Sequence, residues 1–128
     1  MKMKKDDIIS KLKTLDFDPD EYWVIMGAAM VIYGIKEETP DIDLGCTSEM
    51  ADRLEEKGCL YKVTPDGNRW LRVGSGVEVF ENWLYDTIVV KDEIPIISIQ
   101  GLLTMKQRSG REKDSEDIEL IKKHLIIK

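Results

Sequence analysis

Two acidic residues separated by one apolar residue, Asp41 and Asp43, are the side chains whose types and spacing first suggest chemistry. Alternate side chains of a β-strand share one face, so both carboxylates would point to the same place while Ile42 points into the core. Neighbouring carboxylates repel each other unless a cation lies between them. Mg²⁺, or Mn²⁺ in its place, suits such a pair because it binds few carboxylates and completes its coordination with phosphate oxygens of a substrate.

Glu78 supplies a third carboxylate, because in the segment Val77–Phe80 an acid again lies between apolar neighbours. If this segment is a strand beside that of Asp41 and Asp43, Glu78 faces the same site, and three carboxylates can hold two metal ions. One alternative is an edge strand on which acidic and apolar residues simply alternate. Glu81 is a competing acid, but its offset of three residues places it on the opposite strand face.

Gly27 is expected to end a buried strand where a helix begins. Since glycine has no Cβ atom, a ligand can approach the backbone there, and the unpaired N–H groups of a helix start suit a phosphate. The sequence therefore predicts a phosphate-binding turn at Gly27, ahead of the two aspartates in the chain.

The elements that position these residues follow from the spacing of apolar residues and from glycine and proline. Helices are predicted over residues 5–15, 28–33, 48–57, 99–107 and 114–124. Strands are predicted over residues 22–26, 41–46, 59–63, 69–73, 77–80 and 87–90, with residues 95–98 leading into the fourth helix. Asp66-Gly67 is a hairpin signal. This order predicts an α/β (α+β) fold, in which helices flank a small mixed β-sheet.

The motif formed by Gly27-Ala28, a helix, Asp41-x-Asp43 and the later acid Glu78 resembles that of the polymerase-β-like nucleotidyltransferase superfamily. It looks most like small single-domain prokaryotic members related to the AbiEii-type toxins. The C-terminal part is also similar to that group, through the Lys-containing segment 102–106 and the Arg-Asp-containing segment 110–118. The resemblance covers residues 22–120.

The resemblance implies Mg²⁺-dependent transfer of a nucleotide from a nucleoside triphosphate to a hydroxyl group of a small molecule, a protein or an RNA. It implies that Asp41 and Asp43 bind metal, and that Glu78 is the third acid and the general base. The further roles that it implies are phosphate binding by Gly27 and Ala28, triphosphate binding by Lys106, and auxiliary roles for Arg111, Lys113 and Asp114 or Asp117.

The sequence departs from the superfamily pattern at two positions. Ala28 stands where Gly or Ser is usual, and Glu78 stands where Asp is usual. The alternative is therefore a catalytically degenerate module that binds a nucleotide or a partner, such as a component of a toxin–antitoxin pair.

The 128 residues are expected to form one domain, and the formal net charge of −6 argues against broad binding of nucleic acids. No apolar stretch approaches the roughly 20 residues that span a bilayer, so a cytoplasmic protein is expected. The lack of a separate acceptor domain suggests a homodimer or a protein partner. Among the three tryptophans, which are expected mainly in the core, Trp70 is the one that would lie near a nucleotide base.

Overall fold

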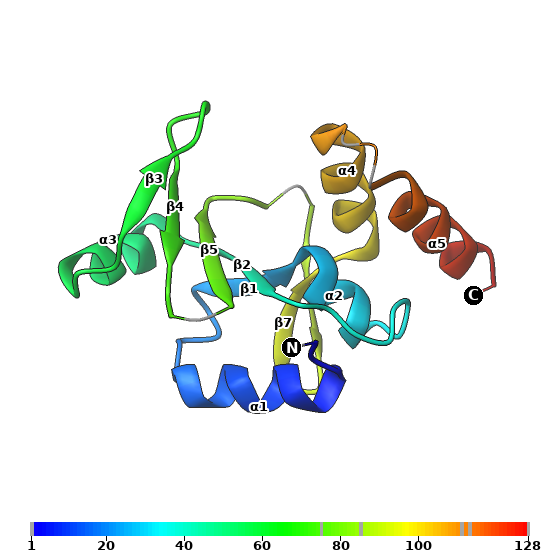
Figure 1. Cartoon of the computed structure of the whole chain (residues 1–128), viewed down its shortest axis with the longest axis horizontal. Coiled ribbons are helices and arrows are strands. Elements are labelled where there is room, and N and C mark those ends of the chain that lie inside the picture. The colour runs from blue at the N-terminus through cyan, green and yellow to red at the C-terminus, as the bar shows by residue number, and fades with distance from the viewer. Residues whose placement is uncertain (1, 75, 85, 111, 113, 128) are drawn as a thin grey trace.

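A seven-stranded mixed sheet runs through the molecule, with strands in the order β3-β4-β5-β2-β1-β7-β6 (Figure 1). The computed structural model describes residues 2–74, 76–84, 86–110, 112 and 114–127. The strands are β1 (Tyr22–Ile25), β2 (Ile42–Cys46), β3 (Tyr61–Val63), β4 (Arg69–Arg72), β5 (Val77–Glu81), β6 (Ile88–Lys91) and β7 (Ile94–Ile97). The prediction of a mixed sheet flanked by helices is confirmed.

Five helices flank this sheet in the described part of the chain: α1 (Lys5–Leu15), α2 (Met26–Ile32), α3 (Ser48–Glu56), α4 (Ile99–Ser109) and α5 (Asp114–Ile127). Helix α2 packs against β1 and β2, α3 against β4, and α4 pairs with α5 (Figure 1). No helix in the described residues has the length and the apolar character that a bilayer crossing requires.

The helix ends follow local sequence signals. The side chain of Thr47 caps α3 by accepting a hydrogen bond from the backbone N–H of Met50 at 3.2 Å. Ser98 caps α4 in the same way through Gly101, at 3.0 Å. Gly110 ends α4 in the left-handed conformation, with φ 61°.

The pairing of β2 with β5 matters most for the site. The two strands are parallel, and the register places Asp43 opposite Glu78. Ile42 and Leu44, on either side of Asp43, are fully buried. The alternation predicted for this strand is therefore present, with the apolar side chains in the core.

Strand β7 differs from the prediction that residues 95–98 only lead into a helix. Residues 94–97 pair with β6 through a two-residue turn at Asp92 and Glu93, both of which have positive φ, 53° and 67°. Tight hairpin turns of this kind favour Asn-Gly or Asp-Gly, so the pair Asp-Glu carries a weak signal. Pro95 also argued against a strand, because proline is rare inside sheets.

Helix α2 begins at Met26, one residue before the predicted turn glycine. Met26 has φ 58°, a left-handed conformation that is unfavourable for a residue with a side chain. The transition from β1 to α2 is therefore made by Met26, and Gly27 lies inside the first turn of the helix.

Candidate functional site

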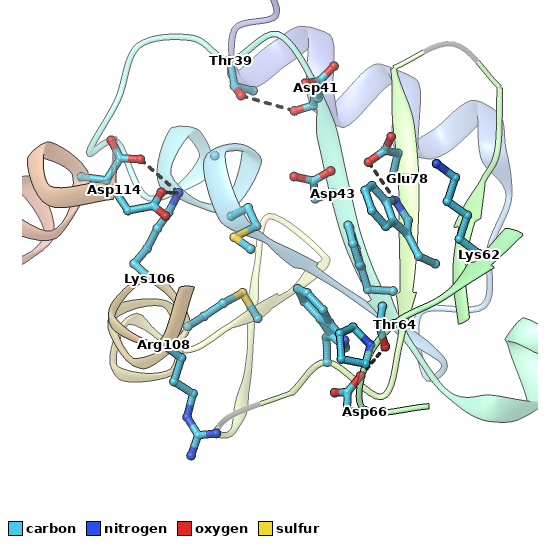
Figure 2. A pocket seen from close by; sticks show the side chains of 18 of the residues that line it. Thr39, Asp41, Asp43, Lys62, Thr64, Asp66, Glu78, Lys106, Arg108 and Asp114 are labelled. Atoms are coloured by element: carbon cyan, nitrogen blue, oxygen red, sulfur yellow. Dashed lines mark hydrogen bonds and ion pairs between the residues drawn. The ribbon is translucent and has the colours of Figure 1, made fainter. Parts of the chain in front are cut away.

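A cavity of about 920 Å³ lies beside β2 and β5 and is closed on one side by α4 and α5 and on the other by the β3–β4 hairpin (Figure 2). Its volume is within the range of ordinary ligand sites. The residues that the sequence singled out and that line it are Gly27, Asp41, Asp43, Trp70, Glu78, Lys106, Asp114 and Asp117.

Asp41 and Asp43 reach this cavity from the start of β2. Asp41 is exposed and Asp43 is partly buried. The segment is held in place because Thr39 Oγ1 donates a hydrogen bond to the carbonyl of Asp41 at 3.3 Å, and the N–H of Ile42 donates to the carbonyl of Gly76 at 2.8 Å. Both predicted aspartates thus line one cavity.

Glu78 lies across from Asp43 on the parallel strand β5 and lines the same cavity. Its carboxylate accepts a hydrogen bond from the indole Nε1 of Trp70 at 3.0 Å, and its other oxygen lies 3.7 Å from Arg72 Nη2. The carboxylate is therefore turned toward β4. In the described residues, no three His, Cys, Asp or Glu side chains are grouped closely enough to hold a metal ion.

Glu81 lies on the opposite face of β5, as its offset predicted. Its two carboxylate oxygens accept hydrogen bonds from Arg69, from Nη2 at 2.7 Å and from the backbone N–H at 2.9 Å. These bonds hold the pKa of Glu81 at about 2, although burial opposes the shift. Arg69 also pairs with Asp52 and Glu55 of α3. This acid is a structural link between the sheet and α3.

Gly27 and Ala28 occupy different surroundings. Gly27 lines the cavity, but a Cβ atom there would lie 2.7 Å from Thr39 Oγ1, so the close neighbour of this glycine is the chain itself. Ala28 is fully buried, and its methyl group belongs to the core. Only the backbone of Ala28 is left for the phosphate contact that the resemblance implied.

Lys106 is a nearly buried cation on the α4 side of the cavity, with 5 % of its surface exposed. Its ammonium lies 3.2 Å from Asp114 Oδ1 and 3.0 Å from Asp117 Oδ2, both on α5. Lys36 adds a second cation 2.7 Å from Asp117. Burial alone would raise the pKa of Asp117, but the bonds from Lys36 and Lys106 outweigh it and lower that pKa. The other two auxiliary residues, Arg111 and Lys113, lie outside the described residues.

Three aromatic side chains form a continuous stack in the cavity wall, which we name the aromatic wall: Trp70, Phe80 and Trp83. The ring centroids of Trp70 and Phe80 are 5.3 Å apart, and those of Phe80 and Trp83 are 4.5 Å apart. The Trp83 carbonyl accepts a hydrogen bond from Trp23 Nε1 at 2.8 Å, which ties the end of the wall to β1. Trp23 in turn lies over Gly45 of β2, where a Cβ atom would overlap its indole ring.

Comparison with known proteins supports the assignment of the fold. No protein-family model matches the sequence, and no curated protein is significantly similar to it. Two solved structures are similar in fold. The lincosamide antibiotic adenylyltransferase LnuA, bound to lincomycin, matches with 17 % identity over 90 % of this chain and 92 % of its own, at a TM-score of 0.53. A candidate nucleotidyltransferase of Thermotoga maritima, TM1012, matches with 17 % identity over 98 % of this chain and 97 % of its own, at 0.57.

The chain has a nucleotidyltransferase fold. This confirms the fold that the resemblance implied, and the narrower resemblance to AbiEii-type relatives stays a prediction.

Several residues of the cavity were not among the predicted site residues. Phe80 had a usable signal, because it follows Glu78 by two residues and therefore shares its strand face. Thr39 and Lys36 carried no local signal, because they lie in the connection between α2 and β2. They reach the site because this connection folds back, which brings Thr39 against Gly27 and Lys36 against Asp117 of α5.

Proposed function

We propose that this protein is a metal-dependent nucleotidyltransferase, which moves a nucleotide from a nucleoside triphosphate to a hydroxyl group of an acceptor. The observation that carries the proposal is the register of β2 and β5. It aligns Asp43 with Glu78 on the wall of a 920 Å³ cavity, and the fold is that of nucleotidyltransferases.

The donor atoms fit the proposed metal in kind. Asp41, Asp43 and Glu78 offer only carboxylate oxygens, which are the ligands of Mg²⁺ and Mn²⁺. We propose that Asp41 and Asp43 hold the ion, which when bound neutralises charge on the phosphates. Trp70 occupies only one carboxylate oxygen of Glu78, so the other oxygen can take a proton or a metal ion. We assign Glu78 the role of base, as the resemblance implies.

In the proposed reaction Glu78 accepts the proton of the acceptor hydroxyl. The freed oxygen forms a bond to the α-phosphorus, and the bond from that phosphorus to the departing pyrophosphate breaks. Trp70 keeps the carboxylate on the cavity side of β5. A positioned base of this kind contributes roughly 10²- to 10⁴-fold to the rate.

The triphosphate is proposed to lie on the α4 side of the cavity. Gly27 and Lys106 line that side, and Lys106 is held there by two α5 carboxylates. These ion pairs fix the position of the Lys106 ammonium, whereas the ammonium of a surface lysine is mobile.

The test is transfer from labelled ATP, GTP, CTP and UTP, with Mg²⁺ or Mn²⁺, to pooled small molecules, RNA and protein. We expect a labelled product that Asp43→Asn abolishes. Asp20→Asn is the matched control, because Asp20 belongs to a second Asp-x-Asp pattern in an exposed turn. Absence of any product, or a product unchanged by Asp43→Asn, contradicts the proposal.

A second candidate is a module that binds a nucleotide or a protein partner without catalysing transfer. Two observations favour it: the carboxylate of Glu78 is already bonded to Trp70, and the side chain of Ala28 is withdrawn into the core. Calorimetry with the four triphosphates, with and without Mg²⁺, separates the two. Binding that depends on Mg²⁺ but never leads to labelled product identifies the module.

A further inference from the structure

The aromatic wall is the feature of the cavity that the proposed chemistry does not use. Trp70, at one end, is 38 % exposed although it stacks on Phe80. Trp70 also lines the cavity, and an exposed indole in a cavity wall is a surface on which a flat ring can stack. We propose that Trp70 and the wall behind it form the acceptor subsite, and that the acceptor is a small molecule carrying a flat ring. This inference rests on the proposed function.

The side chains of the aromatic wall are held in place by contacts within the chain. Trp70 is held by its stacking on Phe80 and by its bond to Glu78. Trp83 is anchored through its carbonyl to Trp23, a buried residue of β1. Because these side chains are already ordered, a ligand that stacks on them loses little of its binding energy to ordering the protein.

The position of the wall indicates the acceptor as its ligand. Figure 2 shows Lys106 and Asp114 on one side of Asp43, and Glu78 and Lys62 on the other. This agrees with the strand order, in which β5, β4 and β3 follow β2 in turn. Trp70 touches Glu78, the proposed base, so a ring on Trp70 places a hydroxyl substituent near the group that would take its proton.

The charge of the cavity argues for a small molecule over the end of a nucleic acid. Six carboxylates line it against four cationic side chains, and two of the carboxylates, Asp43 and Glu78, lie where the acceptor hydroxyl would react. The end of a nucleic acid brings further phosphates beyond those that the proposed metal ion neutralises, so it is repelled by such a lining and by the net charge of −6 on the whole chain.

The experiment uses two matched probes, benzyl alcohol and cyclohexylmethanol, which have the same carbon count but a flat and a puckered ring. The chain has three tryptophans, so its three indole N–H resonances can be assigned and followed by NMR during titration. We expect benzyl alcohol to shift the Trp70 resonance saturably at millimolar concentration, with little effect on Trp23. Cyclohexylmethanol should bind several-fold more weakly.

Two variants control the measurement. Trp70→Leu should weaken binding of benzyl alcohol, followed on the Trp83 resonance, about threefold to tenfold, which is the range of one stacking contact. Phe17→Leu should leave it unchanged, because Phe17 packs edge-on against Tyr22 and does not line this cavity.

Equal binding of both probes, or no shift of Trp70, overturns the inference. So does ATP with Mg²⁺ if it shifts Trp70 in the same way and competes with benzyl alcohol, because the wall would then hold the nucleobase. The titrations with the two alcohols need no nucleotide. Their failure therefore leaves the test of nucleotidyl transfer intact, and failure of transfer leaves the binding result intact.

Discussion

Replacing Glu78 or Glu81 of β5 by glutamine should affect different properties, transfer in the first case and stability in the second. Glu78 faces the cavity, and Glu81 faces Arg69 on the other side of the sheet. We expect Glu81→Gln to lower the free energy of unfolding and leave the cavity intact. We expect Glu78→Gln to slow transfer strongly and leave stability almost unchanged.

The magnitude for Glu81 follows from its pKa. The hydrogen bonds from Arg69 lower this pKa from the ordinary value of 4.5 to about 2. A shift of this size corresponds to about 3 kcal/mol of stability, and because Gln can still accept a bond from Arg69 we expect a loss of about 2–3 kcal/mol. In a chain of 128 residues this lowers the melting temperature by roughly 10 °C.

The sign of the pH dependence is fixed by the direction of the shift. The folded protein favours the charged form of Glu81, so its contribution is complete above pH 4.5 and is lost as the pH falls toward 2. The difference in stability between the natural protein and Glu81→Gln should therefore be full at pH 7 and shrink steadily below pH 4.5.

Glu78→Gln should cost no more than about 1 kcal/mol, because the side chain is partly exposed and the amide oxygen can still accept the Trp70 hydrogen bond. The same variant should slow transfer by roughly 10²-fold or more, since an amide cannot take a proton.

Urea unfolding of the three proteins at pH 7, 5 and 3, beside the transfer assay, measures these effects. The reasoning is refuted if both variants lose the same stability at pH 7. It is also refuted if the deficit of Glu81→Gln is as large at pH 3 as at pH 7, or if Glu78→Gln retains full transfer.

Three further changes test the geometry of the fold. Glu93→Gly should raise the free energy of unfolding by about 0.5–1 kcal/mol in thermal denaturation, since Glu93 has φ 67°; no gain would show that this turn is unstrained. Gly45→Ala should cost at least about 1–3 kcal/mol and shift the indole resonance of Trp23, because the new methyl group overlaps that ring; an unchanged spectrum would contradict the packing. Lys106→Met removes one cation from the two α5 carboxylates, while Lys36 still pairs with Asp117, and should cost about 1–3 kcal/mol in urea unfolding at pH 7; no measurable loss would show that the cluster contributes little.

The alignment of the acidic residues could be predicted from the sequence because it depends on a local property. The period of two in a strand places Asp41 and Asp43 on one face, and the same alternation recurs around Glu78. The pairing of the two strands had to be assumed, and the register of β2 and β5 confirms it.

The contacts of these residues could not be predicted, because they join segments that are distant in the chain. The bond from Trp70 to Glu78 depends on the pairing of β4 with β5. The burial of Lys106 depends on the angle at which α5 returns against α4, which no spacing in the sequence records. Strand β7 was missed for a local reason, since the turn before it lacks glycine.

The segment between β2 and β5, which we call the excursion, contains α3 and the β3–β4 hairpin, and β5 after it pairs directly with β2. Lys62 and Trp70 belong to this excursion, whereas Gly27, Asp43 and Lys106 lie outside it. Under the proposed roles, a lineage that lengthens or replaces the hairpin alters which acceptor fits while the residues proposed for metal and triphosphate stay in place. Acceptor choice and nucleotide handling could then be inherited separately.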